Sequence, residues 1–423
     1  MRRMIAELDN FAATMGTMGR QARTAATALA KLPGTARDEA LRKAAMAMRL
    51  AAPDILAANA RDMTKFKGSP AFGDRLLLNE SRLEAMARGL DEVADLPDPL
   101  SRTLAEWTRP NGLRIARIAQ PIGVLGMIYE SRPNVGADAA AIAIKSGNAI
   151  ILRGGSESFH SAQAIQNAMT AGLKAAGLPE NAVQIPPSTD RGFVAAMLAA
   201  VGHIDLIIPR GGKALVERVQ LEARVPVLSH AQGLNHTYIH EAAAPEMARR
   251  ILANAKMRRP GVCGATETLL IDAAIAPSLL PVLVKDLSAL NCSFKADERA
   301  RAICPELPAA RAEDFDTEWL DAVLNIAVVD GPNAALTHVM MHGSEHTEAI
   351  ITQDEQVAEA YLARSTAAVT LWNASTQFCD GGEFGFGAEI GIATGHIHAR
   401  GPIGPEQLTT FRYVVRGTGQ VRP

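Results

Sequence analysis

The hydrophobic positions of the first sixty residues repeat with the period of amphipathic helices. Alanine, leucine and methionine recur every three or four residues from 5 to 60, with a break at Pro33-Gly34. Similar spacing predicts another helix over 80–92. Residues 113–119 alternate instead between apolar and polar side chains, which is typical of a half-exposed strand. We therefore expect a helical layer followed by a strand.

From residue 124 onward, short apolar runs alternate with helical segments. The pattern predicts strands at 124–129, 149–152, 205–208 and 225–228, and helices at 136–145, 159–176, 194–201 and 212–222. Strands alternating with helices indicate an α/β fold with a parallel, doubly wound sheet. A second alternating set begins near Thr237, and a chain of 423 residues is long enough for two or three domains.

Composition narrows the class of protein. Apolar residues make up 48% of the chain, charged residues 21%, and the formal net charge is −2, so no basic excess suggests a nucleic-acid partner. The four cysteines are scattered without a C-x-x-C pair, which indicates a reduced, cytoplasmic setting. The first ten residues lack the apolar core of a signal peptide, and no apolar run reaches membrane-spanning length. We expect no membrane partner.

One cysteine lies in a setting typical of a nucleophile. Residues 259–268 read RPGVCGATET, so Cys263 follows a basic run (Lys256, Arg258, Arg259) and precedes a strand expected at 268–271. Nearby cations and the backbone N–H groups of a turn favour the thiolate, the form that attacks carbon electrophiles. A single cysteine is more often a small buried hydrophobe. On these residues alone both interpretations stay open.

Two expected strands end in basic loops with paired glycines. The first loop contains Arg153, Gly154, Gly155 and Ser156, and the second contains Arg210, Gly211, Gly212 and Lys213. Such loops bring backbone N–H groups close to an anion, and a following helix N-terminus adds favourable potential. Neither loop is G-x-G-x-x-G, and one Gly-Gly pair is usually only a turn. Two at matching sheet positions indicate a nucleotide site, and Arg153 after its strand favours NADP over NAD.

Three histidines have a spacing that invites a metal interpretation. His338, His342 and His346 are spaced four residues apart, as zinc ligands on one helix would be. Gly343-Ser344 interrupts such a helix, and no acidic residue sits at metalloprotease spacing. We therefore expect no metal site.

Five stretches of the chain carry a family pattern. They are IYESRPNV (128–135), KSGN (145–148) leading into LRGGSES, IIPRGGK (207–213), RRPGVCGATETLL (258–270), and the region running from 329 through 392. Together they resemble the γ-glutamyl phosphate reductase family of the aldehyde dehydrogenase superfamily, and the likeness runs from about residue 10 to the C-terminus. Two positions depart from the pattern: Asn235 stands where cysteine is expected, and Gly264 where asparagine is common.

The resemblance implies an aldehyde dehydrogenase-like domain arrangement. Residues 1–238 would form a Rossmann-like NADP(H)-binding domain, interrupted by an oligomerisation hairpin at 100–120. Residues 239–385 would form the catalytic domain with the nucleophilic cysteine. Residues 386–423 would form a return segment and a C-terminal oligomerisation strand, YVVRG. A homo-oligomer is therefore expected.

The same resemblance implies roles for particular residues. Cys263 would be the nucleophile, with Asn134 helping to form the oxyanion hole. Arg153 and the loop at 209–213 would hold the adenosine phosphates of NADPH, and Glu318 would contact the nicotinamide ribose. The substrate's anionic groups need cations, and the candidates nearest by sequence are Arg132, Lys256 and Arg259.

The activity implied is NADPH-dependent reduction of γ-glutamyl phosphate to glutamate 5-semialdehyde through a cysteine thioester, in proline biosynthesis. Glutamate 5-kinase, which would supply the labile acyl phosphate, is a further implied partner. The alternative is a hydrolytic, NAD-linked semialdehyde dehydrogenase. Hydrolytic relatives use a glutamate to activate water, whereas residues 230–235 read HAQGLN and contain no carboxylate. This favours reduction. A catalytically silent binding protein is disfavoured by the intact Cys263 turn and both glycine loops.

Overall fold

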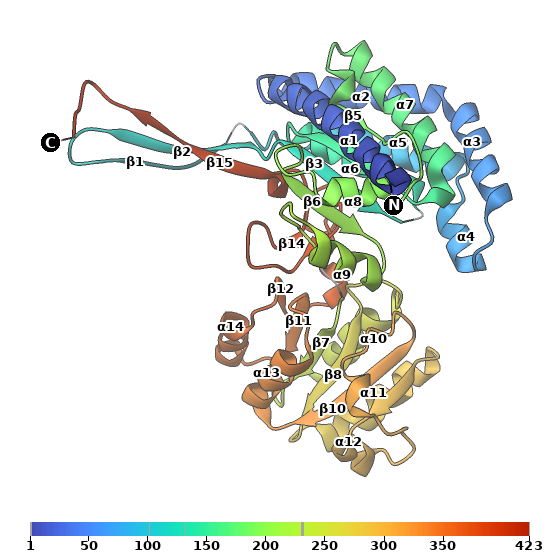
Figure 1. Ribbon diagram of the computed structural model, residues 1–423. Helices are drawn as coiled ribbons and strands as arrows, with labels where there is room; N and C mark the ends of the chain where they lie inside the picture. Colours follow the sequence, from blue (N-terminus) through green and yellow to red (C-terminus); the bar gives the residue numbers. More distant parts are fainter. Residues whose placement is uncertain (1, 101, 131, 230–231, 423) are drawn as a thin grey trace. The chain divides into compact units, whose positions relative to one another are not determined.

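A computed structural model describes residues 2–100, 102–130, 132–229 and 232–422. The chain divides into two compact units (Figure 1). Unit 1 comprises residues 1–229, 385–391 and 403–423, and unit 2 comprises residues 230–384 and 392–402. We describe each unit by itself.

Unit 1 begins with the helical layer that the apolar spacing predicts. Its helices are α1 (Arg2–Leu29), α2 (Gly34–Leu50), α3 (Ala52–Lys65), α4 (Pro70–Leu76) and α5 (Glu80–Asp95). Pro33 is the N-cap of α2, which confirms the expected break. Small side chains let this layer pack closely, because a Cβ at Gly172 of α7 (Phe159–Ala175) would lie 2.3 Å from the Cα of Ala44.

The central sheet of unit 1 is parallel and buried, as expected for an α/β fold. It comprises β3 (Val124–Tyr129), β4 (Ala149–Arg153), β5 (Val183–Gln184) and β6 (Leu206–Arg210), in the order β5-β4-β3-β6. Its further helices are α6 (Pro133–Lys145), α8 (Gly192–Leu198) and α9 (Lys213–Glu222). The strand expected at 225–228 is wrong, since only an isolated bridge joins Val227 to Ile207. Pro226 has no N–H group with which to extend a ladder.

The order of these strands predicts where unit 1 would bind a ligand. After β3 the chain continues to β4 and β5 on one side, and β6 then pairs with β3 on the other. In open parallel sheets, ligands bind outside the carboxyl ends of the strands at such a reversal. The residues that follow β3 and β6 therefore border the expected ligand crevice of unit 1.

A separate antiparallel sheet of unit 1 contains β1 (Thr103–Thr108), β2 (Arg114–Pro121) and β15 (Thr409–Arg416), in the order β1-β2-β15. Figure 1 shows the three strands side by side. The strand expected at 113–119 is confirmed, and the C-terminal strand pairs with it through Tyr413 opposite Arg117.

Unit 2 is built on a second, larger parallel sheet. Its strands, in sheet order, are β12 (Val369–Trp372), β11 (Thr347–Ile351), β7 (Asn235–Ile239), β8 (Thr266–Asp272), β10 (Val323–Val329) and β9 (Ser293–Ala296). The helices are α10 (Pro245–Met257), α11 (Ala276–Ala289), α12 (Glu298–Ile303), α13 (Gly331–His342) and α14 (Glu355–Arg364). A short pair, β13 (Ile392–Ala393) and β14 (Gly401–Pro402), completes the unit.

The division between the units falls before the place that the sequence suggested. A boundary after residue 238 would cut β7, whereas the compact units separate between residues 229 and 230. β7 belongs to unit 2 because it pairs in parallel with both β8 and β11. Apolar residues of this sheet form two buried clusters. Among the described residues, no helix is long and apolar enough to cross a lipid bilayer.

Candidate active site

The Cys263 turn connects α10 to β8 at the amino end of the unit 2 sheet. The N–H group of Ala265 donates to the carbonyl of Val262 over 3.0 Å, which closes the turn. Strand β8 starts directly afterwards, at Thr266. The RPGVC pattern therefore folds as predicted, with the cysteine on a tight turn before a strand.

The four thiols differ in their access to solvent. Cys263 is partly exposed, whereas the others are exposed by 7% or less: Cys292, Cys304 and Cys379. Burial raises the pKa of Cys292 to about 11 and also raises the pKa of Cys304, so both remain protonated thiols at neutral pH. Accessibility thus singles out Cys263 as the candidate nucleophile.

The segment before β7 packs directly against this turn. A Cβ at Gly233 would lie 2.2 Å from the carbonyl oxygen of Cys263, so no larger residue fits there without a shift of the backbone. Asn235, fully buried, donates to the carbonyls of Cys263 and Ala265 over 2.6 and 2.9 Å. The two departures from the family pattern, Asn235 and Gly264, thus meet at one turn. His230 and Ala231 lie outside the described residues.

A carboxylate reaches this segment from a distant part of the chain. Glu318 lies on the connection before β10, and its Oε1 accepts a hydrogen bond of 2.9 Å from the N–H of Gly233. Gly233 therefore contacts both the Cys263 turn and Glu318. Residues 232–235 themselves contain no carboxylate. Glu318 nevertheless lies beside them, a contact that cannot be read from the sequence because the two segments are 85 positions apart.

A buried ion pair supports the connections on both sides of the turn. Nζ of Lys256 on α10 lies 2.9 Å from Glu267 on β8, and both side chains are almost fully buried. Burial raises the pKa of Glu267 to about 7, although the charge of Lys256 and its hydrogen bond act in the opposite direction. Glu267 also accepts from the N–H of Leu320 over 3.3 Å. Lys256 is one of the expected substrate cations, and its ammonium is thus paired with Glu267.

The other two expected substrate cations are exposed. Arg259 lies in unit 2, four residues before Cys263, and its carbonyl accepts from Nε2 of Gln377 over 3.2 Å. Arg132 lies in unit 1 as the N-cap of α6. Asn134 lies in the first turn of that helix, also exposed, and donates to Asp138 over 3.1 Å. Burial raises the pKa of Asp138 to about 6, opposed by this hydrogen bond and by the charge of Arg210.

The first glycine loop follows β4 and is braced by its own arginine. The Arg153 side chain is buried, and its guanidinium donates to the carbonyls of Gly154 and of Thr189, the latter over 2.7 Å. A Cβ at Gly154 would lie 2.9 Å from the ring of Tyr129, so glycine is needed for the close approach. Ser156 is exposed and starts a short 3₁₀ turn, η1 (Ser156–Ser158).

The second glycine loop already holds an anionic oxygen. The carboxylate of Glu130, which follows β3, accepts a 2.9 Å hydrogen bond from the N–H of Gly212, the N-cap of α9. A Cβ at Gly211 would lie 2.6 Å from the same carboxylate. Lys213 is exposed and lies 3.8 Å from Glu217. The loop after β6 thus binds a negative group at the reversal point of the sheet.

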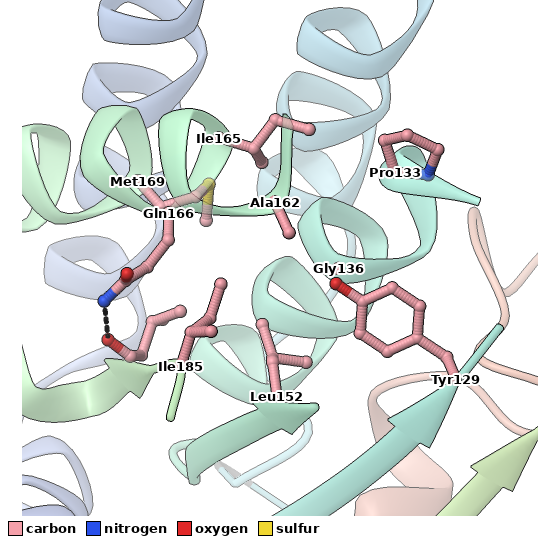
Figure 2. Close-up of a pocket in the computed structure, with 10 residues that line it drawn as sticks. Tyr129, Pro133, Gly136, Leu152, Ala162, Ile165, Gln166, Met169 and Ile185 are labelled. Carbon is pink, nitrogen blue, oxygen red and sulfur yellow. Dashed lines mark hydrogen bonds between the residues drawn. The ribbon is translucent and has the colours of Figure 1, made fainter. Parts of the chain in front are cut away.

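Two of the cavities in unit 1 bear on the site, and they differ in what they could hold. Figure 2 shows one of about 10 Å³ near the hydroxyl of Tyr129, which points toward Gly136 and has no hydrogen-bond partner among the described residues. That volume admits one water molecule at most. The other, of about 340 Å³, lies beside the first glycine loop and is large enough for part of a cofactor. Its lining includes Lys65, Phe66, Ser156, Glu157, His160 and Thr189.

The histidines at four-residue spacing do not assemble into a metal site. His338 and His342 lie on α13, and Gly343 ends the helix before His346. Burial lowers the pKa of His338 to about 3, so its ring is neutral. No group of three or more histidine, cysteine or acidic side chains within the described part of the chain could hold a metal ion.

Comparison with known proteins places this geometry in a family. A model of the aldehyde dehydrogenase family matches residues 9–317. The γ-glutamyl phosphate reductase of Acidiphilium cryptum is 69% identical over 97% of this chain and 98% of its own length. The chain belongs to the γ-glutamyl phosphate reductase family. The relative from Gluconobacter oxydans is 66% identical, over 96% of this chain and 95% of its own.

A solved structure has the same fold over nearly the full length. The γ-glutamyl phosphate reductase of Thermotoga maritima matches with a TM-score of 0.94 and 38% identity, covering 97% of this chain and 100% of that one. The aldehyde dehydrogenase-like α/β fold expected from the sequence is therefore confirmed.

The Lys256–Glu267 pair gives a prediction about stability. At pH 8, above the pKa of Glu267, Glu267→Gln leaves a buried ammonium without its carboxylate and should lower the free energy of unfolding by about 3–5 kcal/mol. Lys256→Met/Glu267→Gln removes both charges and should be more stable than Glu267→Gln. Denaturant unfolding measures both. The control is Asp286→Asn, which breaks the half-exposed Arg249–Asp286 pair and should cost under about 1 kcal/mol. Additive losses in the double variant would contradict this account.

Proposed function

We propose that this protein reduces γ-glutamyl phosphate to glutamate 5-semialdehyde with NADPH, through a thioester on Cys263, as a step of proline biosynthesis in the cytoplasm. The observation that carries the proposal is Cys263 itself. It is the partly exposed thiol among four, on a turn held by Gly233 and Asn235, in a chain of this family.

In the proposed reaction, the Cys263 thiolate attacks the γ-carbonyl carbon of the acyl phosphate. The S–C bond forms, the C–O bond to phosphate breaks, and inorganic phosphate leaves with the electron pair. The N–H of Cys263 stabilises the oxyanion, and Asn134 is the proposed second donor. NADPH supplies the hydride that takes the acyl group to the aldehyde level. Cys263 is released as thiolate with the product, which restores the starting state.

The residues of unit 1 fit a dinucleotide at the carboxyl ends of β3, β4 and β6. At the second loop, the N–H of Gly212 already holds a carboxylate oxygen, which shows that it can bind an anion. The cavity of about 340 Å³ beside Ser156 offers room for part of the adenosine. In this proposal the loops at 153–156 and 209–213 hold the phosphates, and Glu318 meets the nicotinamide ribose. Membership of the aldehyde dehydrogenase family supports a nicotinamide cofactor.

Substrate recognition is assigned to exposed cations. Arg132 and Arg259 are proposed to bind the anionic groups of the substrate, because both are exposed. Lys256 is also a proposed substrate cation, but its ammonium is paired with Glu267 and buried, so it would act through its charge and not by direct contact. Each cation needs its own test by substitution.

Self-association is proposed for the antiparallel sheet of unit 1. Phe411, Tyr413 and Val415 of β15 are exposed by 44–57%, and Trp107 of β1 packs edge-on against Tyr413. Apolar side chains on an exposed sheet with open edges favour pairing with another copy. Association with glutamate 5-kinase, which would shorten the path of a labile acyl phosphate, is a further proposal.

The nucleophile is tested by Cys263→Ala. We expect turnover to be abolished, with folding and NADPH binding retained, because alanine cannot form the thioester. Single substitutions of the buried cysteines by alanine serve as controls and should keep most activity: Cys292, Cys304 and Cys379. Reverse-direction assays with pyrroline-5-carboxylate, phosphate and NADP measure all four variants. Turnover near wild type in Cys263→Ala would exclude the covalent route.

Cofactor choice is tested at Arg153. The enzyme should prefer NADPH to NADH. Arg153→Ala should lower the affinity for NADPH selectively, by about one to two decades, as expected for the loss of one charge-assisted phosphate contact. The control Lys174→Ala removes an exposed cation elsewhere in unit 1 and should leave the affinity for both cofactors unchanged. Because Arg153 also bonds two carbonyls, an equal loss with NADPH and NADH would assign it to bracing the loop alone.

The hydrolytic alternative is tested without reductant. Enzyme mixed with the acyl phosphate and no NADPH should release about one phosphate per active site in a burst, followed by a slow phase. Mass spectrometry should then find the adduct on Cys263. Rapid multiple turnovers would favour the hydrolytic dehydrogenase. Glu318→Gln tests whether Glu318 activates the water in that hydrolysis, since its carboxylate accepts from the N–H of Gly233. If Glu318 activates water, this variant alone should slow the multiple turnovers.

A further inference from the structure

The side chain of Asn235 joins three separate parts of unit 2. Asn235 is the first residue of β7, which lies between β8 and β11 in the sheet. It is opposite Thr266, the first residue of β8, and its side chain reaches Thr347, the first residue of β11. The residue is fully buried. Its carboxamide therefore lies where the amino ends of three strands meet.

All the hydrogen bonds of this carboxamide go to backbone groups. Nδ2 donates to the carbonyls of Cys263 and Ala265 over 2.6 and 2.9 Å, and Oδ1 accepts from the N–H of Thr347 over 3.1 Å. A carboxamide has two N–H donors, so both are used on the nucleophile turn. Aspartate would have at most one donor for two carbonyls, and leucine would have none.

The two carbonyls held by Asn235 lie on either side of Gly264. The orientation of the Cys263 carbonyl sets ψ of Cys263, and hence how the thiol and its N–H are directed from the backbone. Glycine at the next position leaves that backbone with more freedom than any other residue would. The bond to the Ala265 carbonyl is buried and the one to the Cys263 carbonyl is partly buried, so the donors are costly to lose, since an unsatisfied buried acceptor costs free energy. Asn235 thus supplies the restraint that Gly264 does not.

We propose that Asn235 is a positioning residue for the nucleophile: it fixes the peptide groups around Cys263 in the orientation used for acyl transfer. The role rests on the proposed function of Cys263, but it concerns the rate of thioester formation and not the binding of cofactor. It acts through the backbone of Cys263 and makes no contact with the reacting atoms in this account.

The test compares the rate and the extent of phosphate release without NADPH. In Asn235→Ala the burst rate and kcat should fall about ten- to a hundredfold, because small misplacements of a reacting group cost that much. The burst amplitude per folded protein should stay near one, and KM for NADPH should stay within about twofold of wild type. A merely structural role would instead lower the amplitude and leave the rate per active site unchanged.

Asn59→Ala is the matched control. Asn59 is 2% exposed, donates to Leu76 and Ser161 over 2.9 and 3.1 Å, and accepts from Leu78 over 2.8 Å. Asn59→Ala therefore loses the same number of hydrogen bonds as Asn235→Ala, three, but among helices of unit 1. We expect a similar loss of thermal stability in both variants, with kcat within about twofold of wild type only in Asn59→Ala.

If Asn235→Ala does not fold, Asn235→Asp keeps the proposal falsifiable; if it folds, Gly264→Ala in that background adds a second test. Asn235→Asp keeps the volume and loses at least one of the two donors, so it should also slow the burst. Gly264→Ala in the Asn235→Ala background should restore part of the burst rate, because a Cβ restricts the backbone that Asn235 no longer holds. That Cβ would lie 3.3 Å from the carbonyl of Thr376, a contact that a small shift relieves.

A wild-type burst rate in Asn235→Ala or Asn235→Asp would overturn the positioning role. A loss of activity in Asn235→Ala that equals its loss of burst amplitude would also overturn it. The same holds if Gly264→Ala in the Asn235→Ala background slows the burst below the rate of Asn235→Ala alone. Failure of the underlying function is distinguishable, since wild-type enzyme would then show no burst or Cys263→Ala would keep its turnover.

Discussion

The close packing of the chain at Gly233 against the carbonyl of Cys263 is the constraint on which the Cys263 turn of unit 2 depends. With a hypothetical Cβ only 2.2 Å from that oxygen, the two segments have no room for a side chain between them. This approach brings Asn235 within reach of the Cys263 turn, and the N–H of Gly233 donates to Glu318. A turn, a strand start and a distant loop thus form one site because one residue has no side chain.

Charge in the interior of unit 2 supports the same turn from the other side. Lys256 precedes the turn and Glu267 follows it, so their buried ion pair ties together the two elements that the turn connects. Burying both charges costs solvation free energy, which the pair offsets only while it stays intact. Glu267 further bonds the backbone of Leu320, two residues from Glu318. The connection that carries Glu318 is therefore tied to Glu267 through the backbone of Leu320.

In unit 1, the corresponding feature is a pair of glycine loops at the carboxyl edge of a parallel sheet. The order β5-β4-β3-β6 creates the reversal, and glycine loops after β4 and β6 expose backbone to it. Glu130 occupies the Gly212 N–H in this structure, so a phosphate bound there must displace the carboxylate or bind beside it. Arg153 turns its guanidinium to backbone carbonyls, which shapes the first loop whether or not it also meets a phosphate.

The sequence by itself determined the α/β class, the break at Pro33, most helices and strands of unit 1, and Cys263 on its turn before the strand β8, because these follow from local periodicity, turn chemistry and short motifs. It misplaced the unit boundary and predicted a strand at 225–228, because strand membership depends on pairing partners and Pro226 lacks the donor that pairing needs. Only the tertiary structure decided that Lys256 is paired and buried, that Asn235 holds the carbonyls around Gly264, and that Glu318 lies beside residues 232–235. Those contacts join residues 11 to 85 positions apart, and no local pattern encodes a hydrogen bond whose partners meet only when strands pair in a sheet.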